Sequence, residues 1–79
     1  MSLFFFDTRD NEDLIDDDVG HDYPDLEAVK VAATRALTEL ARDVIPGRLR
    51  HKLSVEVRDD LGPVLMATMT FEAVILRQT

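Results

Sequence analysis

Residues 24–47, PDLEAVKVAATRALTELARDVIPG, decide the fold of this chain because they carry its one long helical pattern. Apolar residues recur there at steps of three or four, which gathers them on one stripe of a helix. Asp25 is suited to be the N-cap, since its carboxylate can accept free backbone N–H groups of the first turn, and Pro46–Gly47 ends the helix. The stripe contains Leu26, Val29, Ala33, Ala36, Leu37, Leu40 and Val44. We expect Leu37 and Leu40, in its middle, to be fully buried against a sheet.

Two strand patterns follow the helix. Residues 52–58 alternate polar and apolar side chains, which is typical of a strand with one buried and one wet face, and Ser54 falls on the wet face. Residues 59–62 form a hairpin loop in which Gly62 takes a positive φ. Residues 63–71 form the next strand. Its core face carries Leu65, Ala67, Met69 and Phe71, and its opposite face carries Met66, Thr68 and Thr70.

Two shorter strands precede the helix. Residues 3–6, LFFF, form an apolar run with aromatic bias that is short enough for a strand and apolar on both alternating faces. Residues 9–12 form a turn, where Asp and Asn tolerate the left-handed conformation that tight hairpins need. Residues 13–16 return as the second strand. Residues 17–20 form a further turn, and Gly20 supplies a positive φ without steric cost.

The predicted order of elements is therefore β-β-α-β-β within a single domain, residues 1–79. One amphipathic helix on one face of a small, mostly antiparallel sheet is the simplest two-layer arrangement of these elements. The predicted fold class is thus α+β. The second face of the sheet stays uncovered, and we expect Leu3, Phe5 and Met66 to lie on it.

Six short motifs are spread over nearly the whole chain. They are Phe4–Asp7 (FFFD), Asp18–Gly20 (DxG), Pro24–Ala28 (PDLxA), Val55–Asp59 (VxVRD), Gly62–Leu65 (GxVL) and Thr70–Glu72 (TFE). Together they resemble a family of short uncharacterised bacterial proteins described as a domain of unknown function. The chain departs from that family in its first turn, where glycine is common and this chain has Asn11 or Glu12. The resemblance implies no activity, because no catalytic residues are established for the family.

Charge is distributed unevenly along the chain. The net charge is −7, and residues 1–25 hold nine acids against one base. Such a surface repels a phosphate backbone, which argues against nucleic-acid binding by the whole domain. The local exception is the cluster Arg48, Arg50, His51 and Lys52. It is either a small anion or RNA patch, or a loop whose cations complement the helix C-terminus, and the second interpretation is favoured because no aromatic residue lies near to stack bases.

The remaining polar residues predict no catalytic, cofactor or metal site. The acidic stretch is Asp10, Glu12, Asp13, Asp16, Asp17, Asp18 and Asp22. Counted from Asp16 it misses the glycine position of a calcium-binding EF-hand loop, so it is interpreted as a solvated hairpin. His21 beside Asp22 could orient a base, but neither Ser2 nor Ser54 lies in a nucleophile elbow. We therefore expect a protein that is not an enzyme.

The chain's size and composition favour a cytoplasmic protein that associates with itself. It has no cysteine, no secretory signal and no stretch of the roughly 18 apolar residues that a membrane span needs. A core of this size supplies little stability by itself, and a two-fold partner would cover the open sheet face. The expected function is a non-catalytic, homo-oligomeric interaction or regulatory module, with a homodimer as the simplest form. The alternatives are an antitoxin-like protein associated with nucleic acid, by analogy of architecture, and a small enzyme.

Overall fold

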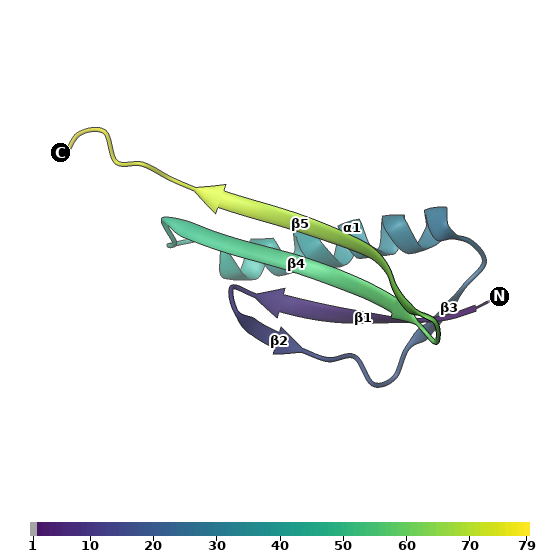
Figure 1. Ribbon diagram of the computed structural model, residues 1–79. Coiled ribbons are helices and arrows are strands. Elements are labelled where there is room, and N and C mark those ends of the chain that lie inside the picture. Colours follow the sequence, from purple (N-terminus) through teal and green to yellow (C-terminus); the bar gives the residue numbers. More distant parts are fainter. Residues whose placement is uncertain (1) are drawn as a thin grey trace.

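The computed structural model describes residues 2–79, which form a five-stranded antiparallel sheet with one helix on one face (Figure 1). The elements are β1 (Ser2–Asp10), β2 (Asp13–Ile15), β3 (His21–Tyr23), α1 (Leu26–Val44), β4 (Arg50–Asp59) and β5 (Gly62–Glu72). The sheet order is β2-β1-β4-β5, and β3 also pairs with β1. This arrangement confirms the predicted α+β class with one helix on a small antiparallel sheet.

The first strand is longer than expected and carries two short strands on one edge. β1 continues to Asp10, so the turn narrows to Asn11–Glu12, and Asn11 takes the left-handed conformation at φ 53°. β2 pairs with the C-terminal end of β1 and β3 pairs with its N-terminal end. β3 was not predicted from the sequence, because its three residues between Gly20 and Pro24 are too few to show a strand period.

The core lies between α1 and the strand residues that face it. Its buried apolar residues are Phe4, Val29, Ala33, Leu37, Leu53, Val55 and Val57. The helix begins as predicted, since Oδ1 of Asp25 accepts the Ala28 backbone N–H at 2.8 Å. The predicted stripe is only partly buried. Leu40 is half-buried, and Leu26 and Ala36 are exposed. The buried part of α1 is narrower than its stripe of apolar residues, so residues at the margins of the stripe stay accessible to water.

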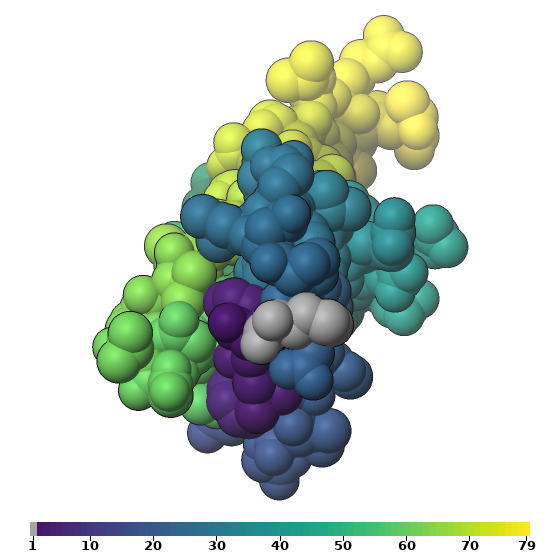
Figure 2. Space-filling view, turned by 90° about the vertical axis from the view of Figure 1, so that its right-hand side faces the viewer, coloured from purple at the N-terminus to yellow at the C-terminus, as the bar shows by residue number. Residues whose placement is uncertain are grey.

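The β4–β5 hairpin is the longest feature of the sheet. A bulge at Val57/Arg58 leaves Val64 without a register partner, because Val57 lies opposite Leu65 and Arg58 lies opposite Pro63. Beyond β5, the Ala73 backbone N–H donates to the Leu49 carbonyl at 2.8 Å. The following residues, which we call the tail (residues 74–79), extend away from the sheet in Figure 1 and stand out at the top of Figure 2.

Candidate functional site

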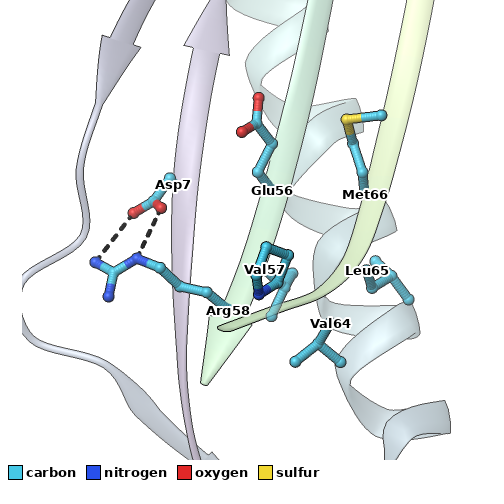
Figure 3. Close-up of a pocket in the computed structure, with 8 residues that line it drawn as sticks. Asp7, Glu56, Val57, Arg58, Val64, Leu65 and Met66 are labelled. Carbon is cyan, nitrogen blue, oxygen red and sulfur yellow. Dashed lines mark hydrogen bonds and ion pairs between the residues drawn. The ribbon is translucent and has the colours of Figure 1, made fainter. Parts of the chain in front are cut away.

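The sheet face away from α1 carries a cluster of three charged residues, Asp7, Asp17 and Arg58. Arg58 Nε donates to Asp7 Oδ2 at 2.9 Å, and its Nη2 donates to the Asp17 carbonyl at 2.9 Å. The Asp17 backbone N–H donates to Asp7 Oδ1, also at 2.9 Å. In Figure 3 the Arg58 side chain reaches from β4 past β1 to the Asp7 carboxylate. The cluster therefore joins β4, β1 and the β2–β3 connection.

Asp17 completes the edge of β1 at the position where no strand pairs with it. β2 pairs with Thr8–Asp10 and β3 pairs with Ser2–Phe4, which leaves the Phe6 N–H between the two. Asp17 Oδ2 accepts that N–H at 3.0 Å. Its other oxygen accepts the backbone N–H groups of Val19 and Gly20 at 3.0 and 3.2 Å. One carboxylate thus satisfies a strand donor and also closes the turn that leads into β3.

Phe5 is covered from within the chain. The guanidinium of Arg58 lies 4.6 Å from the centre of the Phe5 ring, which is a cation–π contact. Gly20 also packs against Phe5, so closely that a Cβ there would lie 2.9 Å from a ring carbon. We expected Phe5 to be an uncovered residue of the open face, and this was wrong: it is half-buried. Met66, by contrast, is 66% exposed, as expected.

The charges of this cluster are held in their ionised forms. Burial would raise the pKa of Asp7, but the hydrogen bonds from Arg58 and Asp17 and the charge of Arg58 outweigh it, so the pKa lies below its ordinary 3.8. Acceptance of the Phe6 N–H is the main reason that the pKa of Asp17 is also lowered, although burial opposes this. The hydrogen bond to Asp7 raises the pKa of Arg58. The cluster therefore stays charged at neutral pH.

The lowered pKa values predict acid sensitivity of the fold. Near and below pH 3.8 the unfolded chain binds more protons than the folded chain, so the stabilisation is fully present above that pH and is lost as pH falls through the lowered pKa values. We expect the free energy of unfolding, measured by urea titration, to fall over this range. Asp17→Asn should show a shallower fall, and Asp18→Asn, at an exposed neighbour, should keep the original slope. Parallel curves for all three proteins would contradict this role of Asp17.

Other side chains of the same face are engaged in pairs across the strands. Arg9 Nε contacts Glu56 Oε2 at 2.8 Å, and Arg50 Nε contacts Glu72 Oε2 at 3.1 Å. Ser54 lies between Arg9 and Thr68 in register and is buried, not exposed as predicted. Its small side chain is shielded by larger neighbours. The open face is therefore more polar and carries more ion pairs than the sequence pattern indicated.

The structure separates the residues of the predicted basic cluster. Arg48 is exposed in the loop and Arg50 is paired with Glu72. His51 turns toward the helix side, where it is buried and its Nε2 makes a hydrogen bond with Asp10 Oδ1. Lys52 alternates back to the open face, because successive strand residues point to opposite faces. The cluster does not form one cationic surface.

The acidic stretch is likewise divided among local contacts. Asp10 contacts His51, Asp17 binds backbone N–H groups, and Asp13 and Asp16 are exposed. His21 lies exposed in β3. Among residues 2–79, no three His, Asp or Glu side chains converge in the manner of a metal site. Within the same residues, no helix is long and apolar enough to cross a membrane.

A shallow groove lies on the open face beside the β4–β5 hairpin. It encloses about 520 Å³ and is mainly apolar on its β5 side, with charged side chains on its β4 and β1 side. The lining residues are Asp7, Glu56, Val57, Arg58, Pro63, Val64, Leu65 and Met66. In Figure 3 the Arg58 guanidinium points away from Val64, Leu65 and Met66 toward Asp7. The β5 side of the groove is therefore free of the ion pair.

The outer edge of β5 is the second open surface. Within residues 2–79 no strand pairs with this edge. The Ala73 N–H donates to the carbonyl of Leu49, the residue before β4, and hydrogen-bonded pairs alternate along an antiparallel ladder. The backbone N–H and C=O groups of the odd-numbered residues of β5 therefore face β4. The outward N–H and C=O groups then belong to Met66, Thr68, Thr70 and Glu72. We call these groups the β5 edge.

Fold and surface together define a small two-layer α+β domain with one ion-paired sheet face and one long open strand edge. The chain belongs to the family "Domain of unknown function (DUF6894)", whose model matches residues 3–71. No curated protein and no solved structure matches the chain. The motif residues Asp7 and Arg58 form an ion pair on the open face.

Proposed function

We propose that this protein is a non-catalytic interaction module that associates with a second copy of itself through the β5 edge. The observation that carries the proposal is the length and composition of that edge. β5 runs for 11 residues, from Gly62 to Glu72, and residues 64–71 contain no charge and no proline. Proteins usually protect exposed edges with lysine, proline, bulges or short strands. This edge lacks such protection in its central part.

A two-fold axis makes the β5 edge complementary to itself. Two antiparallel copies of one strand present N–H groups to C=O groups at matching positions, so each outward group finds a partner. The helices of both copies then lie on the same face of one continuous sheet. A small core such as this one, with seven buried apolar residues among residues 2–79, gains stability from any apolar surface that association removes from water.

The charged cluster supports a structural role over a catalytic one. A general acid or base is most effective when its pKa lies near the working pH. The pKa values of Asp7 and Asp17 are shifted away from neutrality, and the hydrogen-bonding capacity of both is used to hold strands and a turn. Their arrangement therefore favours holding the open face rigid over proton transfer.

The proposal includes a cytoplasmic setting in a bacterial cell. Small secreted domains commonly depend on disulfides, and this chain contains no cysteine, which favours a reducing compartment. An antitoxin-like role is less well supported, because the basic residues that would contact nucleic acid are dispersed. An enzymatic role is less well supported for the reason given above for the charged cluster. Retardation of a DNA or RNA band at moderate salt would favour the antitoxin-like role instead.

The test is the mass in solution of the protein and of a variant blocked at the β5 edge. Light scattering at micromolar concentration should give about twice the 8.9 kDa of one chain. Thr68→Pro removes an outward N–H but none of the inward ones, and edge strands tolerate proline. It should therefore keep its circular dichroism spectrum and give the mass of one chain.

Thr68→Val is the matched control, because it changes the same side chain and retains the backbone N–H. It should keep the doubled mass. A wild-type protein that stays at 8.9 kDa at high concentration would overturn the proposal. A doubled mass for folded Thr68→Pro would show that the copies associate through another surface.

A further inference from the structure

We propose that the tail of each copy seats on the partner copy, with Val74 and Leu76 placed along the apolar side of the open-face groove. This inference rests on the proposed self-association and specifies its geometry. It assigns the groove an occupant, the apolar segment of a second copy of this chain. Each chain has one tail and one groove, so a two-fold dimer fills two grooves with two tails.

The tail has the composition and position of a segment that binds elsewhere. Val74 is 67% exposed, Ile75 60% and Leu76 92%, so three successive large apolar side chains face water. The hydrogen bond from the Ala73 N–H to the Leu49 carbonyl keeps Ala73, the residue before the tail, in line with β5. The tail therefore leaves the sheet as a direct continuation of β5, along the same edge that we propose to pair.

The groove lies where an antiparallel partner strand would deliver that tail. Val64, Leu65 and Met66 line its apolar side and belong to the N-terminal half of β5. In an antiparallel pair, the C-terminal end of one strand runs beside the N-terminal half of the other. Pairing of the two β5 edges thus brings each tail to the partner's groove without any change of chain direction.

Side-chain matching favours one register among those centred on an outward-facing residue. When the two β5 strands pair with the two-fold axis at Thr70, Val74 of one copy lies opposite Met66 of the other. Both side chains lie on the open face, because side chains alternate along the strand. Pairing of the two β5 strands about Glu72 would place the Glu72 carboxylates of the two copies opposite each other. A pair centred on Thr68 would carry the tail beyond the hairpin and leave it exposed.

Charge also fits the Thr70 register. Three residues after Val74, Arg77 lies opposite the partner's Pro63, one residue pair from the end of the β4–β5 hairpin, where Asp59 and Asp60 lie. Opposite charges across the rim of an interface favour one register over others.

Cysteine cross-linking tests this geometry directly, because the natural chain has no cysteine. Met66→Cys and Val74→Cys are prepared separately, mixed, allowed to exchange and oxidised mildly. Directly opposite residues bring their Cβ atoms to about 5 Å, within reach of a disulfide after small adjustment. We expect a disulfide-linked product containing one chain of each variant.

The control mixture pairs Met66→Cys with Val19→Cys, because Val19 is 73% exposed, much like Val74, and lies in the β2–β3 turn. The Met66/Val74 mixture should give about tenfold more mixed product, since residues held together have effective concentrations near millimolar. Val74→Asp should also raise the dimer dissociation constant about tenfold, because seating would then bury an unpaired charge.

The outcomes separate this inference from the proposed function. A doubled mass with equal cross-linking in the two mixtures would overturn the seating of the tail and leave the self-association standing. A single-chain mass for wild type would overturn both. A doubled mass with selective Met66–Val74 cross-linking would support both the dimer and its register.

Discussion

Asp17→Ala is expected to lower the free energy of unfolding by about 3 kcal/mol, because a buried or part-buried donor left without a partner costs about 1–3 kcal/mol and hydrogen bonds to charged groups are the stronger ones. The change removes the acceptor of three backbone N–H groups, those of Phe6, Val19 and Gly20. The Phe6 N–H matters most, because it lies within the sheet between β2 and β3. Urea unfolding followed by circular dichroism measures the loss.

Asp18→Ala is the matched control for Asp17→Ala. It removes the same side chain from the next position, which is exposed, so the change in stability should stay within about 0.5 kcal/mol. Asp17→Asn should be intermediate, since the amide keeps one acceptor oxygen and loses the other. Similar losses at positions 17 and 18 would mean that the Asp17 carboxylate does not complete the edge of β1.

Leu37→Ala is expected to cost about 2–5 kcal/mol, the usual range for truncation of a buried leucine. Leu37 is 5% exposed and packs in the core with Val29 and Ala33. A domain of this length has a total stability of only a few kcal/mol from one core, so the variant should be largely unfolded at room temperature. Thermal unfolding followed at the helix signal measures the effect.

Two further positions on α1 calibrate the Leu37 result. Leu40→Ala should cost less than Leu37→Ala, because Leu40 is half-buried and only borders the core. Arg35→Ala, at an exposed position, should change stability by no more than about 0.5 kcal/mol. An effect at Arg35 equal to that at Leu37 would mean that α1 presents a different face to the sheet.

Most of the regular structure follows from patterns within a few residues. The helix could be placed because its apolar period and its N-cap, Asp25, are local features, and the structure confirms both. Gly20 and Gly62 were expected at positions of positive φ, and both occupy them. For the turn at residues 9–12 the sequence indicated only that an Asp or Asn could adopt this conformation, and Asn11 is the residue that does. The alternation of polar and apolar residues in 52–58 correctly predicted which side chains of β4 face the helix. Successive strand side chains point to opposite faces whatever strand lies beside them.

The open face could not be predicted in this way. Three successive aspartates, at positions 16–18, look alike in the sequence, but only Asp17 reaches the Phe6 N–H, 11 residues away in the chain. Likewise nothing near Phe5 indicates that Arg58 covers its ring. The family motifs contain both Asp7 and Arg58, and this was the one signal in the sequence that could have led to their ion pair.

Short-range patterns were therefore enough to predict the class of fold, the position of α1, its cap and the faces that β4 and β5 bury, because each depends on neighbouring residues. The tertiary structure decided which aspartate replaces a missing strand partner, that Ser54 is buried, and that the β5 edge and the tail stay open. These features depend on residues up to 51 positions apart, such as Asp7 and Arg58. Strand pairing brings such residues together, and no local pattern encodes which pairs will meet.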